Sequence, residues 1–396
     1  MANNRIFYAV QQVGFRADGV TDATVFTAVH GVQSVGMTTN FNLSQVFELG
    51  QISIYENIED IPDVEVSLTK VLDGYNLIYT AATVGAAAPT LSGRQNAKSV
   101  FALGIWPDTN DSAKTGTTPE TQCECSGMFV SSLAYSFPVD GEFTEDVSLV
   151  GNHKMWHNDP KVINFGSYGP VNADFAGAFT DAGESPDLAN GGVQRRENLL
   201  MGAPAGGVGG VDANGASRDA DITVLPIQIF GIESDGTNQK TNGLDFGCHV
   251  QSISVSCDLG REEIFELGRK APYHRFATFP LEVTCDIEVI AVSGDMVSAT
   301  EEGIRSNPNS TDCHADSGNL ADETIRIATC DGTRIGLGIK NKLSSVTYGG
   351  GDAGGGNATI TYSYTNFNDM TVLHENDTNT NFLWEDRQDL LGASGS

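Results

Sequence analysis

Two histidines in the stretch GNHKMWHNDP are the residues best spaced to hold a metal ion. His153 and His157 are four residues apart, a spacing that places two imidazoles on one face of a helix, and Asp159 could add an oxygen ligand. The glutamate of an HExxH motif is missing, however, and the glycine, asparagines and proline around the pair disfavour a helix. We therefore predict no metal site here, and expect the polar end of a strand with Trp156 packed inward.

Other patterns that could perform chemistry are incomplete. Cys123 and Cys125 have no second cysteine pair at zinc-site spacing, so two cysteines on one face of a strand explain them. The glycine-rich segments GGVGG and GGGDAGGG lack the lysine of a phosphate-binding loop, the aspartate-rich segments lack the closing glutamate of a calcium loop, and no GxSxG occurs. The sequence thus predicts no catalytic residue, no metal and no cofactor. An acidic hydrolase using Asp258 and Asp286 is an alternative that only the residue types support.

The charge balance narrows the classes of partner. The 396 residues include 22 Lys and Arg against 51 Asp and Glu, a formal net charge of −29. This charge disfavours direct capture of nucleic-acid phosphates or of an anionic membrane, but an acidic wall lets a polyanion pass without sticking. The first residues show no secretory signal, and no run of about 18 apolar residues occurs. We expect a soluble protein made in a cytoplasm, with its seven cysteines mostly reduced.

The chain contains a long internal repeat. A shift of 218 positions aligns residues 32–62 with residues 250–280 without a gap, and nine of these 31 positions are identical. Average composition would give roughly two identities. The identical pairs are Val32, Gln33 and Ser34 with Val250, Gln251 and Ser252; Phe47, Glu48, Leu49 and Gly50 with Phe265, Glu266, Leu267 and Gly268; Tyr55 with Tyr273; and Pro62 with Pro280.

Apolar and polar residues alternate in both copies, before and after a short connector. This period of two predicts a strand, a connector and a second strand, each strand with one buried face. Pro62 and Pro280 enter the second strand, where a missing N–H is tolerated. The glycine that ends the FELG turn should adopt a positive φ. The turn residues that define the repeat are Phe47, Leu49 and Gly50, and Phe265, Leu267 and Gly268.

These patterns predict an all-β fold with one or two short helices, in two domains that cover residues 1–235 and 236–396. The boundary should fall near residues 233–243, and the Gly- and Asp-rich residues 171–221 should form a surface excursion of the first domain. Residues 294–307 and 317–330 are the best helix candidates. A weaker echo aligns Tyr135 in LAYSF with Tyr362 in ITYSY.

The segments VQSVGMTTNFNLSQVFELGQISIYENIEDIPDVEVSLTKVL and HVQSISVSCDLGREEIFELGRKAPYHRFATFPLEVTCDIEVI resemble the core of phage tail tube proteins, in a form with two domains per chain. The resemblance covers both halves and lies in the FELG turn, the proline-entered strand and the repeat itself. It implies a β-sandwich or partial barrel per domain, with neighbouring subunits joined in a closed inner β-barrel. Three or six chains would form (pseudo-)hexameric rings that stack head to tail into a conduit for the genome.

The resemblance also implies a virion location after assembly in the host cytoplasm. The implied partners are further copies of the chain, a tape-measure protein, tail completion and baseplate proteins, and a sheath where the tail is contractile. Genomic DNA would pass through without specific binding, and no membrane would take part. The alternative is a capsid-associated or surface β-sandwich protein that binds a ligand with its long loops.

In a tube, the polar phase of the proline-entered strands would face the lumen. Its acids and hydroxyls would repel DNA and so prevent binding during passage. The alternative for these residues is an ordinary solvated strand face. The lumen-facing candidates are Glu65, Ser67 and Thr69 in the first copy, and Glu282, Thr284, Asp286 and Glu288 in the second.

The connectors between FELG and the proline differ in charge between the copies. One is acidic and the other is basic, so we expect them to make contacts between domains or between rings, where complementary charge sets orientation. The contact candidates are Glu56, Glu59 and Asp60 in the first copy, and Arg269, Lys270 and Arg275 in the second.

Overall fold

The computed structural model describes residues 6–19, 25–106, 119–157, 164–168, 192–200, 223–226, 229, 249–291, 320, 322–350 and 356–374. Strands dominate these residues, which confirms the all-β class. The strands of the first half are β1 (Gln11–Ala17), β2 (Val25–Ala28), β3 (Val32–Asn40), β4 (Leu43–Phe47), β5 (Ile54–Glu59), β6 (Asp63–Val71), β7 (Ser99–Ile105), β8 (Thr121–Pro138), β9 (Thr144–Gly151), β10 (His153–His157) and β11 (Asn164–Tyr168). Those of the second half are β12 (Val250–Asp258), β13 (Arg261–Ile264), β14 (His274–Ala277), β15 (Glu282–Ile290), β16 (Arg326–Ala328), β17 (Arg334–Gly336), β18 (Lys342–Gly349), β19 (Thr359–Phe367) and β20 (Thr371–Leu373). The helices are α1 (Ile78–Ala82) and α2 (Leu91–Arg94), with 3-10 turns at Tyr8–Val10 and Arg196–Asn198.

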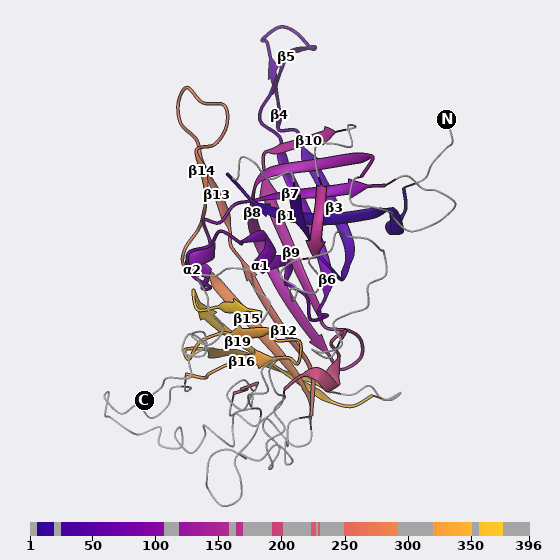
Figure 1. Cartoon of the computed structure of the whole chain (residues 1–396). Helices are drawn as coiled ribbons and strands as arrows, with labels where there is room; N and C mark the ends of the chain where they lie inside the picture. The colour runs from indigo at the N-terminus through magenta and orange to yellow at the C-terminus, as the bar shows by residue number, and fades with distance from the viewer. Residues whose placement is uncertain are drawn as a thin grey trace, which may run out of the picture.

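An antiparallel sheet of eight strands runs through both halves of the chain (Figure 1). Its order is β3-β6-β9-β8-β12-β15-β19-β18, so four adjacent strands come from each half. Strand β8 is 18 residues long, and its C-terminal part lies between β9 and β12. The two halves are therefore joined by a continuous ladder of backbone hydrogen bonds.

A second layer of strands covers the apolar face of the eight-stranded sheet. In the first half, β7, β1, β2 and β11 extend in this order from the N-terminal part of β8, and β10 pairs with the other edge of that part. In the second half, β16, β17 and β20 form a small sheet. One hydrophobic core contains side chains of both layers, including Phe15 and Phe101 of the outer layer with Val66 and Ile253 of the eight-stranded sheet. The described strands do not close into a barrel within one chain.

The repeat forms the same arrangement twice. Strand β3 pairs with β6, and β12 pairs with β15, while β4–β5 and β13–β14 form hairpins between them. Both copies have a β-bulge at the aligned glutamine, Gln33 or Gln251. The side-chain amide of each glutamine donates to the backbone carbonyl two residues earlier, at 3.2 Å in both cases. This shared bulge gives a physical reason for the identity of the Val-Gln-Ser triplet.

The FELG turns of the two hairpins have the same backbone. The N–H of Gln51 donates to the carbonyl of Glu48, and the N–H of Arg269 donates to that of Glu266, both at 3.2 Å. The glycine at the third position has a φ of 94° in Gly50 and 89° in Gly268. Only glycine adopts this φ at no steric cost, so the turn requires it.

The remaining strands of the eight-stranded sheet also correspond. Strands β8 and β18 each contain a bulge, at Ser131 in VSSL and at Ser344 in LSSV. The bulged hydroxyl donates to the carbonyl of the partner serine at 3.1 and 2.9 Å, respectively. Thus β3-β6-β9-β8 corresponds to β12-β15-β19-β18. The echo expected from the sequence is wrong in register, because Tyr135 of β8 corresponds to Tyr348 of β18 and not to Tyr362 of β19.

Both α-helices of the described residues lie in the first half, whereas the sequence predicts helices in the second. The buried carboxylate of Glu145 accepts the N–H groups of Ile78 and Tyr79 at 2.6 and 3.0 Å, which satisfies the start of α1. The helix expected at residues 317–330 is wrong for the described part, which contains strand β16. Ile325 and Ile327 bury alternate side chains there, and this period-two burial overrides the local capping pattern.

Several expectations fall outside the described residues. These are the helix candidate at 294–307, the domain boundary near 233–243 and most of the excursion at 171–221. The division into domains at residues 1–235 and 236–396 therefore stays a prediction.

Candidate functional site

The solvent-facing side of the eight-stranded sheet is polar and acidic. Across its six central strands, from β6 to β19, the outward phase is rich in Ser, Thr, Asp and Glu and contains no Lys, Arg or His. We call this surface the acidic face. The acids on it are Asp63, Glu65, Asp146, Asp258, Glu282, Asp286 and Glu288.

All the residues expected to face a lumen lie on the acidic face, where each is exposed or half-buried. Hydroxyl and carboxyl groups bond across neighbouring strands there, which stabilises the pairing. Thr69 Oγ1 donates to Asp146 Oδ1 at 2.5 Å, and the hydroxyl oxygens of Ser256 and Thr284 are 2.7 Å apart. Sequence reasoning missed Asp146, although it occupies the polar phase of the alternating stretch TEDVSLVG.

The pairing of β8 with β12 is the junction between the two halves. Ile253, Val255 and Cys257 of β12 lie opposite Phe137, Tyr135 and Leu133 of β8, and all six side chains are buried. The ladder continues beyond the strands, because the N–H of Leu259 donates to the carbonyl of Ser131, and that of Val139 to the carbonyl of Gln251, both at 2.8 Å.

The outer strands β3 and β18 expose the residues that correspond to this junction. Among the described strands, β3 pairs only with β6, and β18 only with β19. Val35, Met37 and Thr39 correspond to the buried side chains of β12, yet they are only half-buried. Tyr348 is 63% exposed, whereas Tyr135, its counterpart in β8, is 1% exposed. Each edge therefore has the side chains of a junction without the partner strand.

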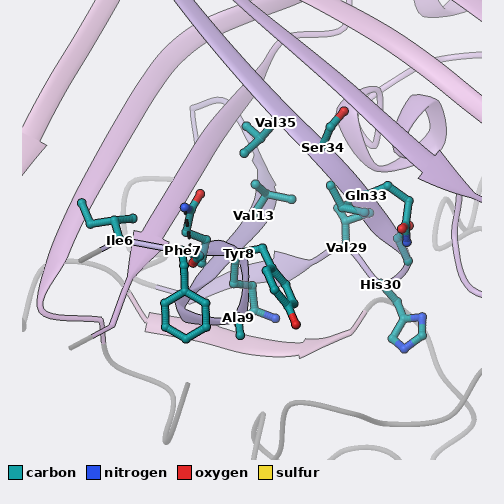
Figure 2. A pocket seen from close by; sticks show the side chains of 14 residues that line it. Ile6, Phe7, Tyr8, Ala9, Val13, Val29, His30, Gln33, Ser34 and Val35 are labelled. Carbon is teal, nitrogen blue, oxygen red and sulfur yellow. Dashed lines mark hydrogen bonds between the residues drawn. The ribbon is translucent and has the colours of Figure 1, made fainter. Parts of the chain in front are cut away.

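A groove of about 880 Å³ lies beside the start of β3 (Figure 2). The N-terminal segment around Phe7 and Tyr8 and the residues from Val29 to Val35 line it. The corresponding space beside the start of β12 measures about 360 Å³, and Phe137, Pro138 and Val139 border it. The larger groove thus lies where β3 has no neighbouring strand.

A buried ionic cluster holds the turn that leads into β3. Lys70 Nζ donates to Asp73 Oδ1 and, at 2.9 Å, to the carbonyl of His30, whose Nδ1 bonds Asp73 Oδ2. Burial by itself would raise the pKa of Asp73, but Lys70 and His30 outweigh it and lower that pKa to about 2. The cluster therefore fixes the first residues of the edge strand.

The two hairpins extend beyond the same end of the eight-stranded sheet, at the top of the view in Figure 1. The β4–β5 hairpin is exposed along its whole length, although it carries large apolar residues. Leu49 and Leu267, at corresponding positions of the two FELG turns, are fully exposed, and Phe47 and Phe265 are more than half exposed. Exposed apolar residues gathered in this way are typical of an interaction surface.

The acidic and basic connectors do not meet within the described chain. Glu56, Glu59 and Asp60 are exposed on the first hairpin, and Arg269 and Lys270 are exposed on the second. Arg275 is different, because it is buried and bonds Asp63 of the first half at 2.6 Å and also Glu263 of its own hairpin. Contacts of the exposed connectors with other chains stay a prediction.

The described residues contain no group of three or more side chains suited to a metal ion. His153 and His157 lie on strand β10 and not on a helix, and Asp159 is outside the described part. Trp156 is half exposed, so the expectation of an inward-packed ring is wrong; β10 lies at a sheet edge. Cys123 and Cys125 are buried in β8 as free thiols.

The two carboxylates of the hydrolase alternative are far apart. Asp286 lies opposite Ser254, four residues before Asp258 along β12, which amounts to about 13 Å of strand. In the described part of the chain, no helix has the length and hydrophobicity needed to span a bilayer.

The chain matches no protein-family model and no curated protein. Among solved structures, a chain of the six-fold symmetrised baseplate of the anti-feeding prophage is 10% identical, with a TM-score of 0.27 over 39% of this chain and 96% of that one. A chain of the tube-terminating cap of the anti-feeding prophage is 12% identical, with a TM-score of 0.29 over 40% and 95%. A chain of the extended sheath–tube complex of an extracellular contractile injection system is 11% identical, with a TM-score of 0.28 over 40% and 95%. Similarities of this size establish no function for the chain.

Proposed function

We propose that the chain is a structural virion protein, a phage tail tube subunit that assembles into stacked rings around a passage for DNA. The observation that supports this most is the β8–β12 junction, where the four-strand unit of one half continues into that of the other. Strand β18 has the position of β8 in its unit, and β3 has the position of β12. Pairing β18 of one chain with β3 of the next would repeat the junction and satisfy both exposed edges.

Three chains joined in this way would form a barrel of 24 strands, since each contributes eight. With strands spaced about 4.8 Å and tilted by about 40°, opposite backbones would be roughly 45 to 50 Å apart. The second strand layer occupies the apolar face of the sheet, so closure directs the acidic face toward the axis. The resulting passage is wide enough for duplex DNA.

The acidic face suits a passage and not a binding site. Duplex DNA carries about one charge per 1.7 Å of its axis, and the six central strands offer it no cation. Repulsion would keep the DNA from adhering during transit. In this proposal a tape-measure protein fills the passage before DNA, completion and baseplate proteins bind the tube ends, a sheath surrounds the tube if the tail contracts, and the parts assemble in the host cytoplasm.

The test compares the assembly of the purified chain with that of an edge variant, by electron microscopy and by mass from light scattering. In the junction, odd-numbered residues of β12 direct their N–H groups to β8, so Met37, which corresponds to Val255, directs its N–H to the exposed edge. Met37→Pro removes this donor without breaking the pairing with β6, and should give a folded monomer. The wild type and the Met37→Leu control should form rings or tubes in multiples of three chains.

A wild-type chain that stays monomeric at high concentration would contradict the proposal. It would favour the alternative, a surface β-sandwich protein that binds a ligand, and the groove beside β3 would then be the first place to look for that ligand.

A further inference from the structure

The second hairpin, β13–β14, packs against the first half of the chain at the residues around Phe129 of β8. We call this place the rim of the first half, and the corresponding residues of β18 the rim of the second half. Arg261 donates to the carbonyls of Val130 and Gln95, both at 2.6 Å, and its guanidinium lies 5.1 Å from the ring centre of Phe129. The ring of His274 also packs edge-on against Phe129, at 5.1 Å between centroids. The hairpin thus continues β12 along β8 and covers Phe129 with two side chains.

The first hairpin, β4–β5, has the same strand pairing, but it is exposed and makes no corresponding contact with the described part of its own chain. Leu43 corresponds to Arg261, and Glu56 corresponds to His274, since the two ladders align with the 218-residue shift. Both side chains are exposed. The acids of the β4–β5 hairpin and its connector are Glu48, Glu56, Glu59 and Asp60, and residues 41–62 contain no Lys or Arg.

Strand β18 and the residues just before it have basic residues at two positions where β8 has none, although Lys98 of the first half also lies over the ring of Phe129, at 5.9 Å. Aligned on the serine bulges, Phe129 of β8 corresponds to Lys342 of β18, and Gly127 corresponds to Lys340. Lys342 is about half exposed and bonds Asp322 at 2.7 Å, and Lys340 is exposed. Next to them, Ile339 and Phe367 expose about half of their apolar surface.

We infer that the β4–β5 hairpin of one chain binds the rim of the second half of the neighbouring chain, with Glu56 paired to Lys342. This inference requires the ring of the proposed function, because the β18–β3 pairing brings the two surfaces together. Leu43 would lie on the alkyl stem of Lys342, as Arg261 lies on Phe129. This contact differs from the direct pairing of acidic and basic connectors expected from the sequence.

The residue types differ between the two hairpin contacts, and this difference supports a second copy of the chain as the partner of the β4–β5 hairpin. Within the chain, a His–aromatic contact joins the halves, and the corresponding pair between chains is a carboxylate and an ammonium group. Complementary charge at both positions is the arrangement that sets orientation and excludes wrong partners at an interface. In a chain with a net charge of −29, an acidic hairpin needs such a local cation to bind a second copy.

The experiment is a charge exchange, measured as the concentration at which half of the chains are in rings. Glu56→Lys and Lys342→Glu should each raise this concentration about tenfold or more at low salt, because each ring contains the contact three times. The double variant Glu56→Lys/Lys342→Glu should return it to within about threefold of the wild type. Lys342→Gln serves as a second variant, since it does not repel Asp322, and Asp140→Lys is the control for an equal charge change at the opposite end of β8.

The outcomes separate the two proposals. If the wild type forms rings and both single variants form them equally well, this inference is overturned and the tube proposal stays in place. The same holds if the single variants fold without assembling and the double variant does not restore assembly. A wild-type chain that forms no rings would overturn both.

Discussion

Lys70, Asp73 and His30 form a buried ionic cluster next to the exposed edge. A buried lysine is costly unless it is paired, and Asp73 provides the pairing while the carbonyl of His30 accepts a further hydrogen bond. Because His30 belongs to the turn before β3, the cluster links the stability of the core to the position of the edge strand. In the proposed ring, the cluster would therefore hold the edge strand that pairs with the next chain.

Replacing Asp73 tests this role directly. Asp73→Asn leaves Lys70 buried without its counter-charge, and should lower the free energy of unfolding by about 3 to 5 kcal/mol at pH 7. The folded pKa of Asp73, about 2, is below the unfolded value of about 3.9, so its stabilisation is complete above about pH 5 and is lost progressively as the pH falls toward 2. Urea unfolding at pH 7, 4 and 2.5 should show the difference from wild type slightly smaller at pH 4 and much smaller at pH 2.5. Equal stabilities at pH 7 would show that the cluster contributes nothing.

At the scale of elements, the two hairpins have equivalent tips. Both FELG turns present a fully exposed leucine on a hydrogen-bonded turn, and both extend past the same end of the sheet (Figure 1). A ring of three chains would therefore present six apolar tips on one face. These tips are suited to contact the next ring in a stack.

The tips can be tested without disturbing the ring. Leu49→Asp/Leu267→Asp should leave single rings but abolish tubes, because each substitution places a charge at the apolar contact while the turn and the sheet edges are unchanged. Leu49→Met/Leu267→Met is the matched control and should form tubes. Electron microscopy of both variants measures the outcome, and tubes of normal length in the aspartate variant would exclude the tips from stacking.

The sequence predicts the elements better than their pairing. The period-two pattern identifies the strands, and the 218-residue shift identifies β3 to β6 with β12 to β15. It does not show that β8 spans two layers or that β3 and β18 are the edges, because strand order depends on contacts distant in sequence. For the same reason the sequence pattern places the echo of Tyr135 on the wrong strand and predicts a helix at the segment around Ile325. Among the site residues, the acids of β6 and β15 follow from the alternation of polar and apolar residues. The proposed role of Lys342 does not, because it depends on the alignment of β18 with β8 at their serine bulges, which the sequence pattern does not show.

At the scale of the whole molecule, the chain contains one complete junction, β8–β12, and two exposed edges, β3 and β18, that correspond to its two strands. In the junction, Ser256 lies opposite Ala134. Transferred to the exposed edges, this register places Thr38 of one chain opposite Thr347 of the next, on the solvent-facing side of the sheet. Opposed residues at a non-hydrogen-bonded position have Cα atoms about 4.5 Å apart, which is within the range that a disulfide spans.

The most direct measurement is therefore oxidation of the Thr38→Cys/Thr347→Cys variant, analysed by denaturing non-reducing electrophoresis. Sheet closure between chains predicts a ladder of covalent dimers and trimers that ends at three chains. The Thr38→Cys/Ser345→Cys control, two residues out of register, and the variants Thr38→Cys and Thr347→Cys alone should remain largely monomeric. If the in-register pair forms no more cross-linked product than these controls, the two edges do not meet and the account of the chain as a tube subunit is wrong.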